Sequence, residues 1–323
     1  MKISIIIPIY NVEECLSKCL DSIYLQGVDE RDFEVVCIND GTPDNSMAIV
    51  EAYASKHSNI VVVNQPNQGV SVARNNGMKV AQGDYILFAD SDDKLADHSL
   101  PCLLQSLHNA PDAEMIVCNH MRNGGYAYDW RKLGFKENTD YDGARVLNGG
   151  QLCGSVMGVV FKKAFLNDNN IMFMPGIKNG EDTIFMLQAF FCAQKVRFLN
   201  RDLYVVVGRA GSASRLFTKS RIDTMIETVK RVSAFRETLL HQSGNRMVLD
   251  YMIYIVLLNL VKDTFLTPGV GYNYLRRAGV GKFCKFELSP DTHFLRNKMR
   301  LIRMSFGLFY FVRKLSVMLK KHN

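Results

Sequence analysis

The sequence predicts an α/β fold with a mostly parallel central sheet, followed by a helical C-terminal region. Over the first 120 residues, short β-branched apolar runs alternate with helical patterns, and this alternation is typical of a doubly wound sheet. The runs are almost continuously apolar, which suits strands covered on both faces. Strands are predicted at 3–9, 33–39, 59–64, 84–89 and 114–119, and helices at about 12–25, 43–56, 69–82 and 97–109. Thr42 is predicted to cap the second helix, with Pro43 as its first residue.

The chain after residue 120 has a weaker pattern. Residues 120–155 are polar, aromatic and glycine-containing, which indicates a loop with room for a hairpin. Residues 208–217 contain small residues and two arginines, which predict a mobile loop, and helical patterns follow to the end. Between these segments, strands are predicted at 156–161, 196–200 and 203–207, and a helix is predicted to begin near Glu181.

The composition is that of a folded globular protein. Of the 323 residues, 47% are hydrophobic and 22% are charged, which is enough apolar material for a sizeable core. The eight cysteines form no C-x-x-C pair and mostly lie in apolar stretches, which favours a reducing compartment. The N-terminal apolar run is too short for a signal peptide, and no run reaches the roughly 18 residues of a membrane span. A cytoplasmic location is therefore expected.

We expect two domains, residues 1–220 and 221–323, and the second ends in a basic tail. The last 32 residues have a charge of +8 and no Asp or Glu, whereas the rest of the chain sums to −1. The basic residues of the tail are Arg296, Lys298, Arg300, Arg303, Arg313, Lys314, Lys320 and Lys321.

Mixed basic and aromatic residues favour an amphipathic helix on an anionic membrane, with Phe306, Leu308, Phe309 and Phe311 inserted. The alternatives are a core-packed helix with a solvated basic face, or a nucleic-acid contact suggested by charge alone.

The predicted strand at 84–89 ends in a cluster of acids with the sequence ADSDD. Asp90 and Asp92 are two residues apart, so at the end of a strand both side chains lie on one side. A divalent cation, Mg²⁺ or Mn²⁺, would relieve their repulsion and bind substrate phosphates. The alternative is that Asp92, Asp93 or Asp97 caps the next helix. The glycine fingerprints of dinucleotide-binding and P-loop proteins do not occur in the sequence.

Four ordered motifs resemble the family 2 glycosyltransferases. They are PIYN at 8–11, NDGTPDNS at 39–46, NQGVSVARNNGMKVAQGDYILFADSDD at 67–93 and GED at 180–182. The resemblance covers roughly residues 1–215 and implies the GT-A fold, a nucleotide-binding α/β sheet with an attached acceptor region. The Q-x-x-R-W motif of processive synthases is absent from the sequence, which disfavours a cellulose- or chitin-type polymerase.

The resemblance also implies roles for individual residues. It places Pro8, Tyr10, Asp40, Arg74 and Asp90 at the nucleotide, with Asp40 at the base. Asp92 is implied as the metal ligand of the DxD motif and Asp182 as the catalytic base. Asn39 stands where the family often has another Asp, and Arg209 or Arg215 would add charge near the diphosphate.

Each of these residues also has a purely structural explanation. Asp40 with Gly41 can form a turn, and Arg74 can be a solvated helix residue. Asp182 can complement a helix dipole, with Asn179 as the N-cap.

The predicted function is inverting transfer of a sugar, a hexosyl or N-acetylhexosaminyl group, from a nucleotide-diphosphate donor, with UDP preferred and Mn²⁺ or Mg²⁺ as cofactor. The acceptor would be a glycan, free or polyprenyl-diphosphate-linked, in cell-surface polysaccharide biosynthesis. The enzyme would lie in the cytoplasm, peripheral at the inner face of the cytoplasmic membrane, without a nucleic-acid partner. The alternatives are a sugar-phosphate nucleotidyltransferase and a non-catalytic nucleotide-binding protein. The sequence leaves the sugar, the linkage and the acceptor open.

Overall fold

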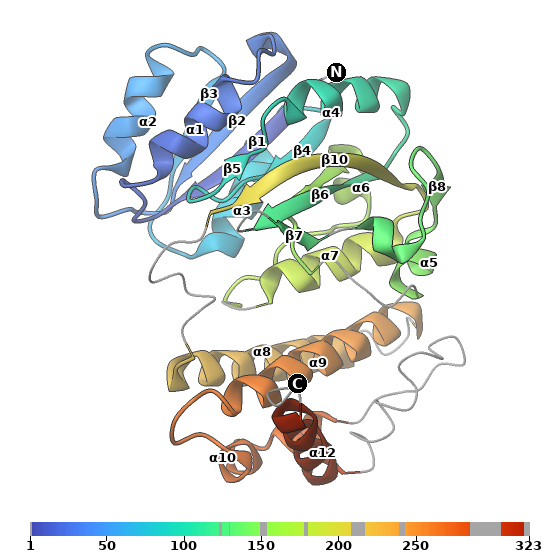
Figure 1. Ribbon diagram of the computed structural model, residues 1–323. Helices are drawn as coiled ribbons and strands as arrows, with labels where there is room; N and C mark the ends of the chain where they lie inside the picture. Colours follow the sequence, from blue (N-terminus) through green and yellow to red (C-terminus); the bar gives the residue numbers. More distant parts are fainter. Residues whose placement is uncertain are drawn as a thin grey trace. The chain divides into compact units, whose positions relative to one another are not determined.

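The computed structural model describes residues 2–122, 125–128, 130–148, 154–177, 180–207, 217–238, 243–284 and 305–319 (Figure 1). The chain divides into two compact units. The first comprises residues 1–176 and 192–209, and the second comprises residues 177–191 and 210–323. The domain boundary that the sequence predicts at residue 220 stays a prediction.

The first unit is built on one ten-stranded sheet. Eight of its strands follow the order β3-β2-β1-β4-β9-β6-β10-β5; of the other two, β7 pairs with β6 and β8 pairs with β10. The strands are β1 (Ile3–Ile9), β2 (Phe33–Asn39), β3 (Ile60–Asn64), β4 (Tyr85–Phe88), β5 (Lys94–Leu95), β6 (Met115–Arg122), β7 (Gly125–Tyr128), β8 (Asp140–Tyr141), β9 (Val159–Lys162) and β10 (Val196–Val206). Neighbouring strands are parallel from β3 to β4 and again between β6 and β10, while β9 joins these parts in antiparallel pairs.

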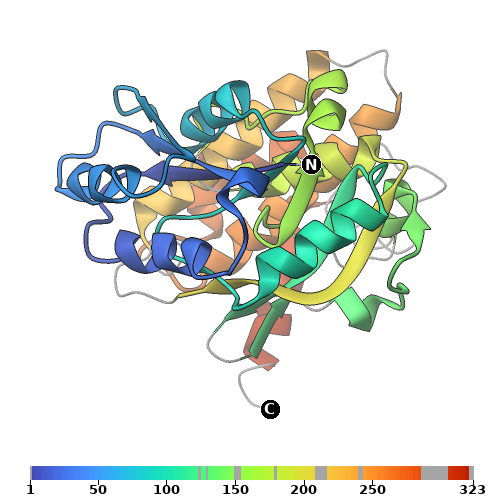
Figure 2. The ribbon, with the colours of Figure 1, turned by 90° about the horizontal axis from the view of Figure 1, so that it is seen from above.

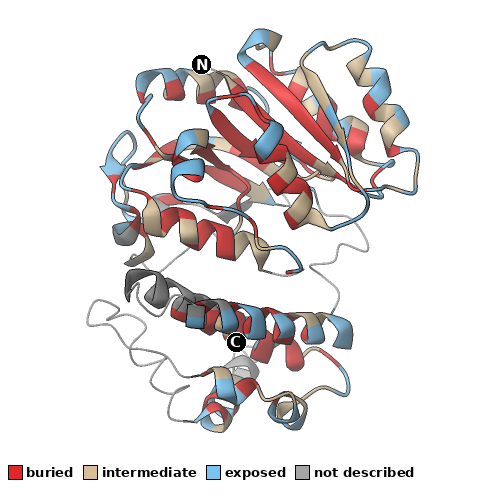
Figure 3. Ribbon diagram, turned by 180° about the vertical axis from the view of Figure 1, so that it is seen from behind, coloured by how far each residue is buried: buried red, intermediate tan, exposed pale blue. Residues whose placement is uncertain are grey.

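The helices of the first unit cover both faces of this sheet (Figure 2). They are α1 (Leu16–Tyr24), η1 (Glu30–Asp32), α2 (Ser46–Ala54), α3 (Val70–Val80), α4 (Ser99–Asn109), η2 (Trp130–Leu133), α5 (Gly143–Asn148) and α6 (Lys163–Asp168). Because both faces are covered, β1, β2 and β4 are buried along almost their whole length (Figure 3). The predicted α/β fold with a mostly parallel central sheet is confirmed.

Three local predictions are wrong in detail. Helix α2 begins at Ser46 after Asn45, not at Pro43. Thr42 instead accepts a hydrogen bond from the backbone N–H of Asn11 and donates one to Asp44. The two strands predicted around residues 200–203 form one strand, β10, since pairing with β6 continues across a bulge near Asp202.

The polar segment after residue 120 forms the hairpin that the sequence allowed, with β6 and β7 antiparallel. His120 is buried on β6. Burial is the main cause that lowers the pKa of His120, to about 4, and Arg122 adds to this effect.

The second unit is helical within the residues described. Its elements are α7 (Glu181–Cys192), α8 (Lys219–Thr238), α9 (Ser243–Thr264), α10 (Tyr272–Arg277), η4 (Val280–Phe283) and α12 (Phe306–Leu319). Helices α8 and α9 are antiparallel: Arg221 pairs with Asp263 at 2.8 Å, and Arg236 with Asp250 at 2.6 Å. Buried charges of this kind must be paired, so these two bridges fix the register of the helix pair.

Helix α12 has one packed face and one exposed face. Phe306, Phe309 and Tyr310 are buried. The rings of Phe306 and Tyr310 lie against Tyr272 of α10, and that of Tyr310 also lies against Phe265, directly after α9. Leu308, Phe311 and Val312 are about half exposed. The predicted insertion of Phe306 and Phe309 into a membrane is therefore wrong, because both rings are used inside the unit. In the described residues, no helix has the length and hydropathy needed to cross a membrane.

Candidate active site

Three parallel strands of the first unit deliver the predicted nucleotide-binding residues to one edge of the sheet. Pairing aligns the end of β1 with the end of β2, at Ile9 and Asn39, and β4 runs parallel on the other side of β1. Pro8 and Tyr10 lie at the end of β1, Asp40 follows β2, and the ADSDD acids follow β4. Ligands of open α/β sheets bind outside these carboxyl ends, so the structure brings four predicted residues to the expected edge.

Asp40 is buried, with 4% of its surface exposed, and its carboxylate is fully engaged. Its Oδ1 accepts hydrogen bonds from Gln65 Nε2 and the backbone N–H of Gln68, at 2.7 and 2.8 Å. Its Oδ2 accepts the N–H of Gly69, the residue before α3, at 2.9 Å. The carboxylate therefore ties the end of β2 to the start of α3, and its contact with a base stays a prediction.

Asn39, at the position where the family often has an acid, joins two strand ends. Its side-chain Nδ2 donates to Asn64 Oδ1 at the end of β3, and its Oδ1 accepts the N–H of Thr42. An amide can both donate and accept, whereas a carboxylate at this position would face the Asn64 oxygen without a proton to donate. The Asn39 side chain therefore fits its neighbours in this chain.

Arg74 points inward from α3 and holds Asp90. Its Nη2 donates to Asp90 Oδ1 at 2.8 Å, and the guanidinium lies 5.0 Å from the centre of the Phe173 ring. Only 3% of Arg74 is exposed, so the alternative of a solvated helix residue is wrong. Helix α3 can lie this close to β1 because residue 77 is glycine: a Cβ there would overlap with the Ile6 side chain.

The acidic turn after β4 gathers three carboxylates. One ligand atom from each of Asp90, Asp92 and Asp93 lies within 4.8 Å of the others. None of them caps α4, whose N-cap is His98 and has no side-chain cap, so that alternative is wrong. Asp90 and Asp92 are partly exposed, and hard oxygen ligands on a partly open turn suit Mg²⁺ or Mn²⁺. The residues therefore fit a divalent cation.

Asp182 lies in the first turn of α7, in the second unit, together with Glu181. Gly180 precedes the helix with φ +95°, a backbone conformation that glycine adopts without strain, and its carbonyl accepts the N–H of Ile184. Both acids complement the helix dipole. Asn179, the predicted N-cap, lies outside the described residues, as do Arg209 and Arg215. The role of Asp182 as base stays a prediction.

Comparison with known proteins decides the family. The sequence profile of Glycosyl transferase family 2 matches residues 4–168, about half of the chain. The chain belongs to glycosyl transferase family 2. It is therefore a glycosyltransferase, and membership of this family disfavours the nucleotidyltransferase alternative.

Two bacterial relatives of this glycosyltransferase show what it resembles in sequence. The poly(ribitol-phosphate) beta-glucosyltransferase of Bacillus spizizenii is 34% identical over 216 residues, 65% of this chain and 33% of that protein. The uncharacterized glycosyltransferase EpsJ of Bacillus subtilis is 29% identical over 233 residues, 70% of this chain and 66% of that protein. This chain thus spans one third of the first relative and just under two thirds of the second.

Solved structures show that this glycosyltransferase has the GT-A fold. The crystal structure of Staphylococcus aureus TarS in complex with UDP-GlcNAc aligns with a TM-score of 0.67 at 19% identity, over 98% of this chain and 92% of that one. The Pyrobaculum calidifontis mannosyltransferase PcManGT, in complex with GDP-Man and Mn²⁺, aligns with a TM-score of 0.56 at 16% identity, over 99% of this chain and 87% of that one.

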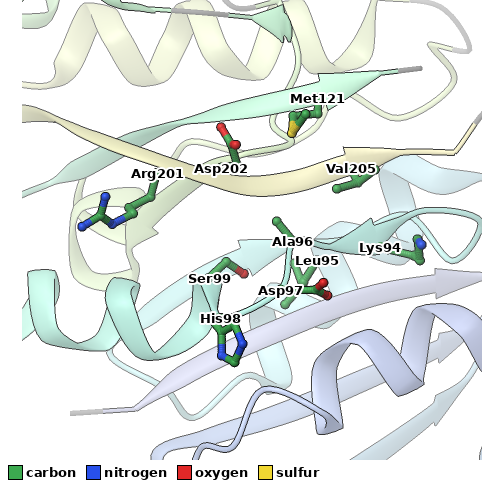
Figure 4. A pocket seen from close by; sticks show the side chains of 10 residues that line it. All are labelled: Lys94, Leu95, Ala96, Asp97, His98, Ser99, Met121, Arg201, Asp202 and Val205. Atoms are coloured by element: carbon green, nitrogen blue, oxygen red, sulfur yellow. The ribbon is translucent and has the colours of Figure 1, made fainter. Parts of the chain in front are cut away.

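A cavity of about 450 Å³ begins where the acidic turn of this glycosyltransferase ends (Figure 4). Its walls come from the segment between β5 and α4 and from strands β6 and β10, and its lining is Lys94, Leu95, Ala96, Asp97, His98, Ser99, Met121, Arg201, Asp202 and Val205. The start of α4 does not offer an anion site. The Ser99 N–H bonds to the Ala96 carbonyl, the Leu100 N–H bonds to Gln26, and Pro101 has no N–H. The lining carries both acidic and basic side chains.

Proposed function

We propose that this glycosyltransferase transfers a sugar, with inversion, from a UDP-sugar to a hydroxyl group of a cell-surface glycan. The observation that carries the proposal is the Arg74–Asp90 pair beside Asp92 at the carboxyl edge of a family 2 sheet. Two further findings support it: a TarS structure of the same fold holds UDP-GlcNAc, and a sequence relative is named for a poly(ribitol-phosphate) acceptor.

The donor would lie across the ends of β1, β2 and β4. Pro8 and Tyr10 would line the nucleoside pocket, with Asp40 near the base. The ion pair with Arg74 fixes Oδ1 of Asp90. Its Oδ2 accepts no hydrogen bond from the described residues and would be available to the donor. Mn²⁺ or Mg²⁺ would be held by Asp92 beside Asp90, and when bound it would neutralise charge on the diphosphate.

Asp182 would act on the acceptor. Its carboxylate takes the proton of the acceptor hydroxyl as that oxygen bonds to the anomeric carbon. The bond from this carbon to the diphosphate oxygen breaks, and UDP leaves with the electron pair. A general base of this kind typically contributes about 10²–10⁴ in rate.

The first experiment incubates the protein with a panel of nucleotide sugars, Mn²⁺ and acceptor glycans, and measures the nucleotide diphosphate released. UDP-sugars should be consumed fastest. Asp182→Asn should lower turnover by about 100-fold while UDP affinity stays unchanged, because the base contacts only the acceptor. Glu181→Gln, at the neighbouring position of the same helix turn, is the matched control and should retain most turnover. If no nucleotide sugar of the panel released its nucleotide diphosphate, the proposed function would be contradicted. If Asp182→Asn turned over as fast as wild type, another residue would have to be the general base.

We also propose that the C-terminal region holds the enzyme on the inner face of the cytoplasmic membrane, where a polyprenyl-diphosphate-linked acceptor would lie. Leu308, Phe311 and Val312 follow helical spacing, so they form one exposed apolar face of α12. The charge of +8 over the last 32 residues would attract anionic lipid.

Co-sedimentation with vesicles tests this membrane proposal. Wild type should bind anionic but not neutral vesicles, and salt should weaken the binding. Replacement of Leu308, Phe311 and Val312 by serine should release the protein, because these side chains are exposed and their loss leaves the packed face of α12 intact. Leu25→Ser is the matched control, since Leu25 is an exposed leucine of the first unit. Equal sedimentation of wild type with neutral and anionic vesicles would contradict the proposal.

A further inference from the structure

The third acid of the turn, Asp93, faces into the protein. Only 6% of its surface is exposed, and its Oδ1 accepts the backbone N–H of Val207 at 2.7 Å. Burial is the main cause that raises the pKa of Asp93 to about 7; the charges of Asp90 and Asp92 add to this effect, and the hydrogen bond from Val207 opposes it. The side chain of Asp93 is thus buried, whereas those of Asp90 and Asp92 are partly exposed to solvent.

Tyr204, on β10, lies beside the acidic turn and binds its backbone. The Tyr204 side chain is fully buried, and its hydroxyl oxygen accepts the N–H of Asp90 at 2.8 Å. Burial raises the pKa of Tyr204 well above its usual value. Tyr204 therefore holds the first acid of the turn, while the backbone of Val207, three residues later, holds the last acid, Asp93.

The turn is bound to β10 in a third way. Directly after Asp93, strand β5 pairs antiparallel with β10, Lys94 with Val205 and Leu95 with Tyr204. The backbone of the turn is also closed on itself, since the Asp93 N–H bonds to the Asp90 carbonyl. The geometry of Asp90 and Asp92 is therefore fixed by a strand more than 100 residues later in the chain.

We propose that Asp93 and Tyr204 are positioning residues, which hold Asp90 and Asp92 in the arrangement that binds a divalent cation with a nucleoside diphosphate. This inference rests on the proposed function of the same turn. It assigns Asp93 to the support of the site and not to the ion, although its carboxylate lies within 4.8 Å of the other two. Like charges packed this closely repel each other, so a turn that must keep them together needs anchors of this kind.

The test measures binding of Mn²⁺ in the presence of UDP, by the loss of the free Mn²⁺ electron spin resonance signal. Tyr204→Phe keeps the ring and removes only the hydroxyl. The Asp90 N–H then loses its acceptor, and we expect Mn²⁺–UDP affinity to fall about tenfold. Tyr85→Phe is the matched control: Tyr85 is also buried in the first unit, and its hydroxyl donates to the Pro111 carbonyl. Tyr85→Phe should lower the melting temperature by a similar amount and leave affinity unchanged.

Substitutions of Asp93 separate support from ligation. Asp93→Asn keeps an oxygen that can accept the Val207 N–H, so Mn²⁺–UDP affinity should stay within about threefold of wild type, whereas Asp93→Ala should lower it about tenfold. If Asp93 were instead a ligand of the ion, Asp93→Asn should lose as much affinity as Asp92→Asn, because a neutral amide oxygen binds a cation less well than a charged carboxylate oxygen.

Three outcomes would overturn the inference. They are a loss in Asp93→Asn as large as in Asp92→Asn, unchanged affinity in Tyr204→Phe, and an equal loss in Tyr85→Phe. A wild-type protein that binds no Mn²⁺ with UDP would overturn the proposed function, and the inference with it. By contrast, a wild-type protein that binds Mn²⁺ with UDP, together with variants that bind it equally well, would overturn only the inference and leave the proposed function standing.

Discussion

The turn after β2 and the turn after β4 both place carboxylates at the same edge of the sheet, but the two turns use them differently. Asp40 is buried and accepts three hydrogen bonds from residues 65–69. Asp90 and Asp92 stay partly exposed, within 4.8 Å of each other. Position after a parallel strand therefore does not by itself define a ligand site: a carboxylate that is buried, like Asp40, stabilises a loop, whereas carboxylates that stay partly exposed, like Asp90 and Asp92, are accessible to a cation.

The two turns are connected through α3. Asp40 accepts the N–H of Gly69 directly before this helix, and Arg74 of the same helix donates to Asp90. A change at Asp40 should therefore reach the β4 turn through the position of α3, whereas a change at Asp92 should stay local. The following predictions use this asymmetry, from the largest expected effect to the smallest.

Asp40→Ala should reduce the free energy of unfolding by about 3 kcal/mol, because the N–H groups of Gln65, Gln68 and Gly69 lose a charged and buried acceptor. Denaturant unfolding monitored by circular dichroism measures this change. Asp40→Asn, which keeps one acceptor oxygen, should cost less. If Asp40→Ala left stability unchanged but abolished UDP binding, Asp40 would be a ligand-binding acid like Asp90 and Asp92, and the proposed difference between the two turns would be wrong.

Asp92→Asn should leave the unfolding free energy within experimental error of wild type. It should weaken UDP binding in the presence of Mn²⁺ by about 100-fold, or ~2.7 kcal/mol. Titration calorimetry with and without Mn²⁺ separates the two contributions, since binding without the ion should not change. An affinity equal to that of wild type in Mn²⁺ would show that the cation is held by other groups.

His120 provides a buried titrating group outside both turns. Its pKa is lowered from 6.5 to about 4 in the fold, so the unfolded chain binds more protons than the folded one between these values. Stability from this residue is fully present above pH 6.5 and is lost as pH falls toward 4. The free energy of unfolding should be about 2 kcal/mol lower at about pH 5 than at about pH 7.5.

His120→Gln should remove most of this slope in denaturant unfolding, while exposed His108→Gln should leave it unchanged. If both variants kept the wild-type slope, the acid sensitivity of the fold would have to come from carboxylates such as those of the two turns.

Arg74→Lys should have the smallest effect, a loss of about 1 kcal/mol in UDP affinity with Mn²⁺. The ammonium keeps the charge near Asp90 but cannot lie flat against the Phe173 ring while it donates. Titration calorimetry measures this affinity for Arg74→Lys and Asp92→Asn under the same conditions. Lys79→Arg, the opposite exchange at an exposed position of α3, is the control and should leave the affinity unchanged. A loss as large as that of Asp92→Asn would mean that Arg74 itself contacts the donor.

Much of the first unit could be predicted from the sequence because its signals are local. The runs of β1, β2 and β4 are buried on both faces, so their residues are apolar apart from Ser4, Glu34 and the terminal Asn39, and the acidic turns begin where the cover ends. The two-residue spacing of Asp90 and Asp92 predicts that both lie on one side of a strand end. The ordered motifs around these residues indicated the family that the comparisons then showed.

Partners from distant parts of the chain could not be predicted in the same way. Nothing near Asp93 in sequence shows that it turns inward, because its partner is the backbone N–H of Val207, directly after β10. An arginine in a helix is usually solvated, yet Arg74 is buried since Phe173 and Asp90 contact it from other parts of the chain.

The sequence by itself determined the strands of the sheet, the acids at its edge and the basic charge of the tail. The tertiary structure decided which acid faces a strand, which arginine is buried and which face of α12 stays exposed. The physical reason is the range of the interactions: hydrophobic periodicity acts between neighbours in the chain, whereas a buried carboxylate or guanidinium is stable only where packing brings a partner to it from far away in sequence.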